Sequence, residues 1–356
     1  MQGMLEGFEA PSTRSADVAR VLVDVDLPHM DRPLDYIVPA GLADAAVVGS
    51  LVRVHLSSAR IDGWIVERTR REVGEGTASL ESVVSSTPVL TPSIYETARR
   101  IAARFLATTS QVLSLAIPPR HARAEREARD ENAPTWPTVT SDRVGLGWEA
   151  YPAGEALVSR LRAGESPRAI ATMLRPRLRG CLSEAVASTV ASRRSVIVVT
   201  ATGEQAGRYA RELSEDLSIP VSLAGSEVAA EKRYRLHVAA SLGRVPVVVG
   251  TRSAVWVPCS RLGLIIIVDD GDDRLRERRF PRCDALDVAV QRCAVEGSGL
   301  LVASSARSVK AQALVRSGWA VGIEPTPQAL REATPRVHLH GSTQAEREGA
   351  GGLMRI

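Results

Sequence analysis

The sequence predicts a multidomain α/β protein, in which a small β-rich module is followed by a short helical segment and then by a parallel α/β lobe. Short strand-like stretches separated by turn residues fill positions 18–68, which is the pattern of an antiparallel sheet. Strand-like and helical stretches alternate over 195–317, as they do in doubly wound parallel sheets. The run Leu264–Val268 is entirely apolar, and such a run is typical of a strand buried on both faces.

The β-rich module is expected over residues 16–90, after a disordered lead at 1–15. Its predicted strands are 18–25, 34–38, 49–56 and 61–67. Strands this short, joined by turn residues, indicate a small antiparallel barrel or sheet. A module of this size is more typical of binding than of catalysis.

A helical segment is expected over residues 91–119, where Ile94, Ile101 and other apolar residues at helical spacing form one face. The two prolines at 118 and 119 end it. The mixed-charge run that follows predicts a solvated charged linker over 120–146. The alternative interpretation of this run is an arm that contacts nucleic acid.

The α/β lobe is expected over residues 147–337, and a disordered tail over 338–356. It begins with a stretch of helical pattern at 154–192. The predicted strands are 195–200, 220–223, 246–250, 263–268 and 299–304. The predicted helices are 204–214, 227–243, 283–296 and 307–317. The order of the strands in the sheet does not follow from the sequence.

Four carboxylates follow the apolar strand, at Asp269, Asp270, Asp272 and Asp273. Ligands of open α/β sheets bind beyond the carboxyl ends of the strands, so these side chains would lie where a nucleotide and its metal ion bind. The alternative is a solvated loop start, or a helix N-terminus stabilised by negative charge.

A nucleotide site of this kind also needs a phosphate-binding loop with the pattern Gly-x-x-x-x-Gly-Lys-Ser/Thr. The chain has only two lysines, Lys232 and Lys310, and neither follows a glycine. The nearest similar stretch runs from Gly203 to Arg208, but its glycine spacing is one residue short and Tyr209 replaces the hydroxyl residue. An ordinary strand-to-helix turn is the favoured interpretation of that stretch.

The composition of the 356-residue chain, 44% apolar and 24% charged, is that of a soluble globular protein. We expect a cytoplasmic location and no membrane partner, because the first residues do not resemble a signal peptide and no apolar run is long enough to cross a bilayer. The net charge of +4 permits binding to a polyanion. The four cysteines form no C-x-x-C pair, so neither a zinc site nor a disulfide framework is expected.

Several stretches together resemble the PriA family of primosomal replication restart proteins. They are V-A-R-V-L-V-D-V-D-L-P at 18–28, L-D-Y-I-V-P at 34–39, G-S-L-V-R-V-H-L at 49–56 and G-T-R-S-A-V-W-V-P-C-S-R-L-G-L-I-I-I at 250–267. The resemblance covers roughly residues 16–337. It implies a module that binds the 3′ end of a DNA strand, then a winged-helix-like segment, then a RecA-like helicase lobe. The family's second lobe and its zinc cysteines have no counterpart, so a truncated or split form is expected.

Within this resemblance, Asp35 falls on the acid of the family's terminal-nucleotide pocket, and Leu34 replaces an aromatic residue. A carboxylate can accept a hydrogen bond from a free 3′-OH, and the missing aromatic ring removes a stacking contribution of about 1–3 kcal/mol. The expected DNA-binding set is Asp35, Leu34, Tyr36 and Arg53. The alternative for Asp35 is a local hairpin residue.

The resemblance also implies a degenerate nucleotide site, with Asp269 and Asp270 as its remnant. The family's acidic box D-E-E-H aligns with Val268, Asp269, Asp270 and Gly271, and its S-A-T-P motif becomes S-A-R-S at 305–308. Because phosphoryl transfer depends on the loop lysine and the metal, turnover should be lost. We therefore predict no catalytic residue, no metal ligand and no cofactor in this chain, with ATP and Mg²⁺ not expected to act.

A basic cluster follows the aspartates, at Arg274, Arg276, Arg278 and Arg279, with Arg282 beside it. Pairing with the neighbouring aspartates is the first interpretation. The alternative is a loop that contacts the DNA backbone, where each phosphate contact adds to the salt dependence of binding.

The function predicted from the resemblance is that of a replication restart factor without helicase activity of its own. Such a factor binds abandoned or stalled replication forks and promotes primosome assembly and loading of the replicative helicase. Its partners would be branched DNA, primosome proteins and the helicase-loading machinery. The alternatives are an ATP-dependent 3′-to-5′ helicase with a divergent nucleotide site, and a decaying gene product with neither activity.

Overall fold

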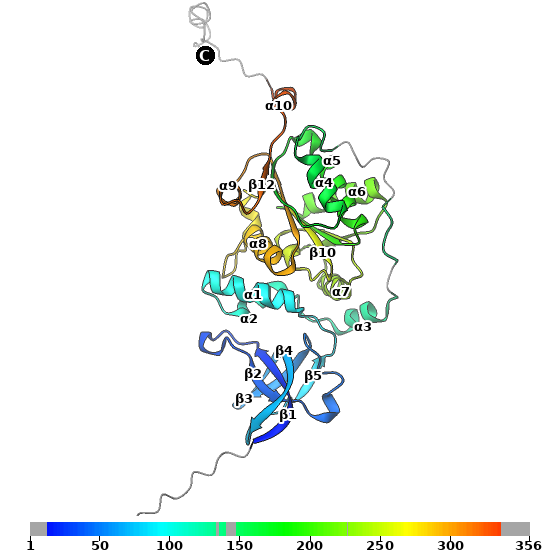
Figure 1. Ribbon diagram of the computed structural model, residues 1–356. Coiled ribbons are helices and arrows are strands. Elements are labelled where there is room, and N and C mark those ends of the chain that lie inside the picture. Colours follow the sequence, from blue (N-terminus) through cyan, green and yellow to red (C-terminus); the bar gives the residue numbers. More distant parts are fainter. Residues whose placement is uncertain (1–12, 133–134, 140–146, 226, 336–356) are drawn as a thin grey trace, which may run out of the picture.

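The computed structural model describes residues 13–132, 135–139, 147–225 and 227–335. Figure 1 shows the β-rich module at one end, helices α1 (Pro92–Phe105) and α2 (Thr109–Ala116) in the middle, and the α/β lobe at the other end. Within the described residues, every helix is too short or too polar to cross a membrane.

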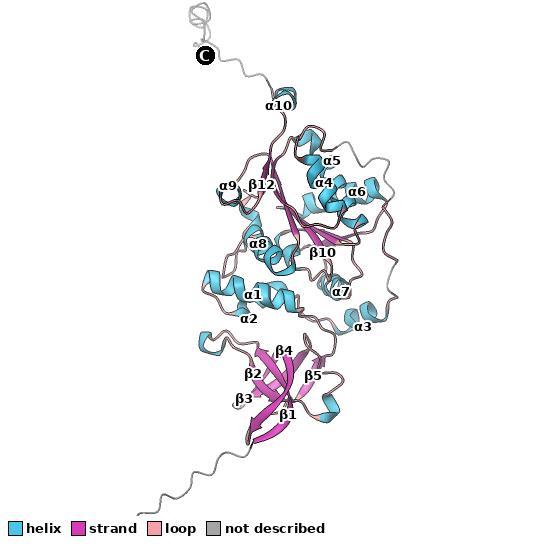
Figure 2. Cartoon of the chain, in the orientation of Figure 1, coloured by secondary structure: helices cyan, strands magenta, loops and turns pink. Residues whose placement is uncertain are grey.

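The β-rich module is an antiparallel sheet with the strand order β2-β1-β4-β3-β5 (Figure 2). Its elements are β1 Thr13–Val23, β2 Leu34–Ile37, β3 Leu51–Leu56, β4 Ala59–Gly74 and β5 Ser82–Ser85, with short 3-10 turns η1 Pro28–Met30 and η2 Ala40–Leu42. Residues 78–81 connect β2 at one edge of the sheet with β3 near the other: the Ile37 N–H donates to Ala78 over 2.8 Å, and the Glu81 N–H donates to Arg53 over 3.0 Å. The sheet therefore closes into a small barrel, which is one of the two forms that the sequence predicted.

Two boundaries of this module differ from expectation. β1 begins at Thr13, so residues 13–15 belong to a strand rather than to the expected lead, while residues 1–12 lie outside the described part. β4 extends seven residues beyond the predicted 61–67 and pairs with the start of β1. This extension was missed because R-T-R-R-E at 68–72 has no apolar alternation.

The helical segment holds the barrel against the lobe. α1 buries Ile94, Ala98 and Ile101, as the apolar spacing predicted. The first turn of α2 receives carboxylates from the barrel: Asp31 accepts from the Thr109 N–H over 2.8 Å, and Asp24 accepts from the Ser110 hydroxyl over 2.5 Å. Negative charge stabilises the N-terminus of a helix, so these contacts fix the barrel to α2.

Residues 122–130, which we expected in a solvated linker, form helix α3 (Ala122–Asp130) instead. Its Glu125 side chain is buried and accepts hydrogen bonds from Ser85, Thr87 and Tyr234 over 2.7, 3.1 and 3.1 Å. Arg120 neutralises this carboxylate at 2.8 Å. The charged run was misinterpreted because the buried face of this helix is small: it consists of Ala124, Ala128 and the buried Glu125, which bonds to the barrel exit and to the lobe.

The lobe is built on a seven-stranded parallel sheet with the order β12-β6-β11-β10-β7-β9-β8. Its strands are β6 Arg168–Thr172, β7 Ser195–Val199, β8 Val221–Ala224, β9 Val247–Gly250, β10 Leu262–Val268, β11 Gly299–Ser304 and β12 Val321–Ile323. Its helices are α4 Gly154–Arg162, α5 Leu178–Ala191, α6 Gly203–Leu217, α7 Ala230–Ser241, α8 Ala285–Glu296, α9 Val309–Arg316 and α10 Pro327–Ala333, with 3-10 turns η3 Arg175–Arg177, η4 Arg252–Trp256 and η5 Asp273–Leu275.

Strand β10 lies at the centre of this sheet, and all seven of its residues are buried. Ile265 and Ile267 point into the layer formed by α1, α7 and α8, whereas Ile266 and Val268 point into the layer formed by α4, α5 and α6. Each isoleucine buried in this way contributes about 1.5–3 kcal/mol to folding. The uninterrupted apolar run predicted this double burial.

The expected helical stretch 154–192 contains strand β6 between α4 and α5. The breakers Gly164, Pro167 and Pro176 mark the ends of these elements, and they should have divided the stretch. β12 and α10 were not predicted. The other predicted strands and helices of the lobe are present, with ends shifted by up to three residues. The expected tail at 338–356 lies outside the described residues.

Candidate nucleic-acid interface

Asp35 lies on the outer surface of the barrel, on β2. Its side chain is 39% exposed, and its Oδ1 accepts from Arg71 Nη2 over 2.9 Å and lies 3.6 Å from Arg20 Nε. Arg20 also donates to Glu67 over 3.0 Å. The result is an exposed carboxylate flanked by two guanidinium groups, an arrangement that offers both an acceptor for a hydroxyl and donors for a phosphate.

The structure does not bring the other three residues of the expected DNA-binding set to Asp35 as one site. Tyr36 does not fit the expected DNA-binding set. Its ring is in the barrel core, and its hydroxyl donates to the His55 carbonyl over 3.2 Å. Burial raises its pKa. Leu34 is half-buried beside it. Arg53 belongs to a separate ion pair, with its Nε 2.7 Å from Asp62 Oδ1.

The acidic strand end is held by contacts within the chain. Ser304, at the end of β11, donates to Asp270 Oδ1 over 2.6 Å, while the Asp270 N–H donates back to the Ser304 hydroxyl over 2.9 Å. Asp269 has a left-handed backbone with φ of 53°, a conformation that aspartate tolerates better than most residues. Asp272 caps η5 and pairs with Arg274 at 2.6 Å.

The loop that meets these carboxylates is the turn between β6 and α5, at residues 173–177. Arg175 Nη1 lies 3.3 Å from Asp269 Oδ2. The stretch at Gly203, which we compared with a phosphate loop, follows β7 and is an ordinary turn in which Thr202 caps α6 by accepting from the Gln205 N–H. The turn at 173–177 reads M-L-R-P-R, so it has no glycine or lysine, and Pro176 has no N–H. It therefore lacks the parts with which a phosphate loop binds a nucleotide.

The basic loop after β10 divides into paired and unpaired arginines. Arg274 pairs with Asp272 at 2.6 Å, and Arg279 Nε lies 3.8 Å from Glu277 Oε1. The other three are exposed, and their guanidinium groups have no ion-pair or hydrogen-bond partner within the described part of the chain: Arg276, Arg278 and Arg282. Pairing with a neighbouring aspartate therefore holds for Arg274 alone, since Arg279 lies beside a glutamate and the other three arginines have no such partner among the described residues.

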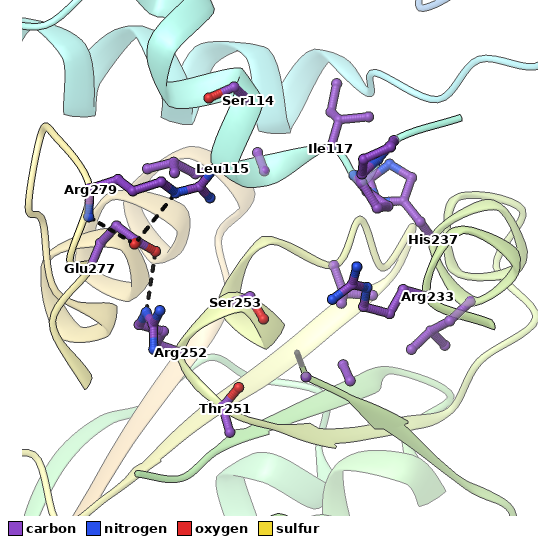
Figure 3. Close-up of a pocket in the computed structure, with 17 residues that line it drawn as sticks. Ser114, Leu115, Ile117, Arg233, His237, Thr251, Arg252, Ser253, Glu277 and Arg279 are labelled. Carbon is purple, nitrogen blue, oxygen red and sulfur yellow. Dashed lines mark hydrogen bonds and ion pairs between the residues drawn. The ribbon is translucent and has the colours of Figure 1, made fainter. Parts of the chain in front are cut away.

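A pocket of about 340 Å³ lies between α2, α7 and the segment that follows β9 (Figure 3). Three arginines line it, Arg233, Arg252 and Arg279. Its other polar side chains include Ser114, Thr251, Ser253 and Glu277, and its apolar wall includes the end of α2 and the residues that follow it, from Leu115 to Pro119. An excess of guanidinium groups beside hydroxyls is suited to an anion such as phosphate.

The conformation of η4, which brings Arg252 and Ser253 to this pocket, depends on a buried arginine of α8. Arg292 is fully buried, and its Nη1 donates to the carbonyls of Val255 and Val257 over 2.6 and 3.0 Å. Glu296 neutralises it at 2.6 Å. These hydrogen bonds fix the end of η4 against α8.

Sequence reasoning missed Arg175, Arg233 and Arg252 as candidate site residues. Arg175 could have been found by dividing the stretch 154–192 at Pro167 and Pro176, because a strand-to-helix turn then appears at 173–177. Arg252 lies in the G-T-R-S-A stretch that supported the family resemblance. No local pattern marks Arg233, since only the fold places α7 opposite α2.

Comparison with known proteins gives the family. Residues 20–118 match the 3′ DNA-binding domain (3′BD) of PriA. Over 318 residues, which are 88% of this chain and 48% of the relative, the sequence is 37% identical to the Probable replication restart protein PriA of Mycobacterium tuberculosis. The protein of the same name in Mycobacterium leprae is 32% identical over the same shares of both chains.

Among solved structures, the DEAD box protein of Methanococcus jannaschii aligns with 53% of this chain and 55% of its own, at 14% identity and a TM-score of 0.37. The lobe itself is a parallel seven-stranded sheet with helices on both faces, which is the doubly wound arrangement that the sequence predicted. The chain is therefore a member of the PriA family, and it spans about half the length of the curated relatives it matches.

Proposed function

We propose that this chain binds branched DNA at replication forks through the 3′ end of a strand, and that it acts in replication restart without hydrolysing nucleotide. The observation that carries this proposal is the match of residues 20–118 to a 3′ DNA-binding domain, within which Asp35 is exposed on β2. The relatives named for replication restart support the wider role. Primosome assembly and helicase loading in the cytoplasm are part of the same proposal.

The charges around Asp35 fit a 3′-terminal nucleotide. A free 3′-OH can donate to the carboxylate, while Arg20 and Arg71 can donate to the preceding phosphodiester. A 3′-phosphate would bring negative charge against Asp35 and offer no neutral donor in its ionised form. A terminal hydroxyl should therefore be preferred to a terminal phosphate.

Two further surfaces would hold the rest of the DNA. The unpaired arginines Arg276, Arg278 and Arg282 can contact the backbone, and Phe280 between them is 52% exposed and can stack on a base. The pocket at Arg233 and Arg252 can take a phosphate.

The proposed lack of hydrolysis is supported by the turn that faces the acidic strand end. Hydrolysis needs backbone N–H groups and a lysine on the phosphates and a metal on the carboxylates. Here the turn at 173–177 supplies neither a lysine nor a glycine-rich backbone, and Arg175 pairs with Asp269. We propose that neither ATP nor Mg²⁺ acts at this site.

The test is fluorescence anisotropy with a fork that carries a 3′-OH leading end, compared with the same fork carrying a 3′-phosphate. The wild type should prefer the 3′-OH by about tenfold, because a hydrogen bond to a charged group is worth about 1.5–3 kcal/mol. Asp35→Asn should lose this preference. Asp130→Asn makes the same change of charge on α3, at a side chain that is 71% exposed, and should keep it.

Phosphate release is measured in the same samples, with and without the fork. We expect no DNA-stimulated release. Equal affinity of the wild type for both forks would refute the role of Asp35 as an end reader. DNA-stimulated hydrolysis would instead favour the alternative of an ATP-dependent helicase that uses Asp269 and Asp270.

A further inference from the structure

The pocket between α2 and α7 contains one carboxylate among its arginines. Glu277 is 14% exposed, and it accepts hydrogen bonds from Arg252 Nε over 3.2 Å and from the N–H groups of Arg278 and Arg279 over 2.8 and 3.1 Å. Arg279 Nε lies 3.8 Å from it as well. Figure 3 shows both arginines directed at this carboxylate.

Arg233 lies across the pocket from Glu277 (Figure 3). Its Nε is buried and has no hydrogen-bond partner among the described residues. A buried donor without a partner is costly, so a turn of the Arg233 side chain that brings this group onto an acceptor in the pocket would be favourable. The one titratable ring in the lining, His237, is buried and neutral near pH 7, because burial lowers its pKa to about 4.

A carboxylate and a phosphate use the same donors, the guanidinium N–H groups and the backbone N–H groups of a turn. Glu277 therefore stands where an incoming phosphate oxygen would bind Arg252 and Arg279. Although burial raises the pKa of Glu277, the hydrogen bonds from Arg279 and Arg252 outweigh it and lower this pKa, so the group is a carboxylate at neutral pH.

We propose that the pocket is a phosphate site that the chain keeps partly closed with its own carboxylate, Glu277. A DNA phosphate first binds Arg233. It then replaces the Glu277 carboxylate as the hydrogen-bond acceptor of Arg252 and Arg279. The exchange adds phosphate contacts in the pocket to those that the exposed arginines of the same segment, Arg276, Arg278 and Arg282, can make with the DNA backbone. This inference rests on the proposed DNA-binding function, and it adds to that function a means of controlling the affinity for DNA.

The test compares Glu277→Gln with Glu212→Gln. The glutamine keeps an oxygen that accepts from the two backbone N–H groups but removes the negative charge. Glu212 is a partly buried carboxylate that lies 4.0 Å from Arg208 on α6, outside the pocket lining, so its replacement makes the same change of net charge.

Fork binding is measured by anisotropy over a range of salt concentrations. Glu277→Gln should bind about tenfold more tightly than Glu212→Gln, which corresponds to about 1.4 kcal/mol. Adding Arg233→Gln to Glu277→Gln should remove most of this gain. Equal affinities of the two glutamine variants would overturn the proposal, and so would weaker binding by Glu277→Gln, which would make Glu277 a positioning residue for the loop.

A second measurement does not depend on DNA. Inorganic phosphate should raise the melting temperature of Glu277→Gln more than that of the wild type or Glu212→Gln. If no variant binds the fork, the proposed function fails. The melting temperatures in inorganic phosphate would still show whether the pocket binds phosphate. An equal response of the three proteins to phosphate, together with no difference on DNA, would refute the inference.

Discussion

The guanidinium group of Arg175 lies 3.3 Å from the carboxylate of Asp269, so the turn after β6 and the end of β10 are joined by an ion pair within the chain. In a nucleotide-hydrolysing lobe these two segments meet through the phosphates and the metal instead. Arg175 is 61% exposed and Asp269 is 21% exposed. Such a pair contributes little to stability, and its importance is that it engages one of the two acids that remain from the family's acidic box.

The first prediction is that Mg-ATP does not stabilise this protein. A ligand at 100 times its dissociation constant stabilises the folded state by about 2.7 kcal/mol, which a thermal melt detects readily. We expect no change in melting temperature at millimolar Mg-ATP, for the wild type and for Arg175→Ala. A rise that appears only in Arg175→Ala would show that the ion pair, rather than the missing phosphate loop, excludes the nucleotide.

A second prediction concerns Glu125, the buried carboxylate of α3. Glu125→Gln removes the charge that compensates Arg120 and disturbs the hydrogen bonds from Ser85, Thr87 and Tyr234. Breaking a buried network of this kind should lower the free energy of unfolding by about 2–4 kcal/mol.

The matched control for Glu125 is Glu127→Gln on the same helix. Glu127 is 36% exposed and pairs with Arg123 across one helical turn, so its loss should change stability by no more than about 0.5 kcal/mol. Urea denaturation of both variants checks the difference. Equal effects would mean that α3 is held by something other than its buried carboxylate.

Much of the fold could be predicted from the sequence, because burial on both faces leaves a direct trace. The run Leu264–Val268 predicted the central strand, and the alternation of strands and helices predicted the parallel sheet. Strand β6 could not be recognised by the same rule: its five residues, R-A-I-A-T, are short and contain two alanines, so they read as helix. Helix α3 was missed because its buried face holds only two alanines and a charged residue, Glu125, and so has no marked apolar stripe.

The sequence could indicate single residues as candidates for the site, and only the fold shows which of them are accessible. Asp35 is exposed on a strand, as its proposed role requires, whereas the neighbouring Tyr36 is buried because alternate residues of a strand face opposite sides. Arg233 and Glu277 are 44 positions apart in the chain. Their meeting in one pocket depends on the packing of α2 against the lobe, which no local pattern encodes.

A third prediction uses His237, a buried ring on α7. Its Nε2 lies 2.8 Å from the Val89 carbonyl, so Nε2 carries the proton and donates it. Burial lowers the pKa of this ring from its ordinary value of 6.5 to about 4. Between these pH values the unfolded chain takes up a proton that the folded chain does not, so the free energy of unfolding falls as the pH decreases from 6.5 towards 4.

The full loss should be about 3 kcal/mol, since one pKa unit corresponds to about 1.4 kcal/mol. Above pH 7 the stability should not depend on this ring. Urea denaturation at several pH values checks the slope, and His237→Gln, which keeps an N–H donor, should be much less sensitive to pH between 4.5 and 6.5. An unchanged pH dependence in that variant would show that other groups cause it.

The last prediction concerns the exposed arginines of the loop after β10. The variant Arg276→Gln/Arg278→Gln/Arg282→Gln removes three guanidinium groups that have no partner within the described residues. If each contacts a phosphate, the slope of log K against log salt should fall by about 2–3, because one contact contributes about 0.7 on single-stranded and about 0.9 on duplex DNA.

The control variant is Arg162→Gln/Arg211→Gln/Arg316→Gln, which makes the same change of net charge at exposed positions on α4, α6 and α9. It should lower affinity slightly and leave the slope nearly unchanged, because a distant charge acts only through the screened field of the protein. Equal slopes for the two triple variants would mean that the loop lies outside the DNA path. A smaller slope in the loop variant alone places the loop on the backbone, where the exposed ring of Phe280 would then meet a base.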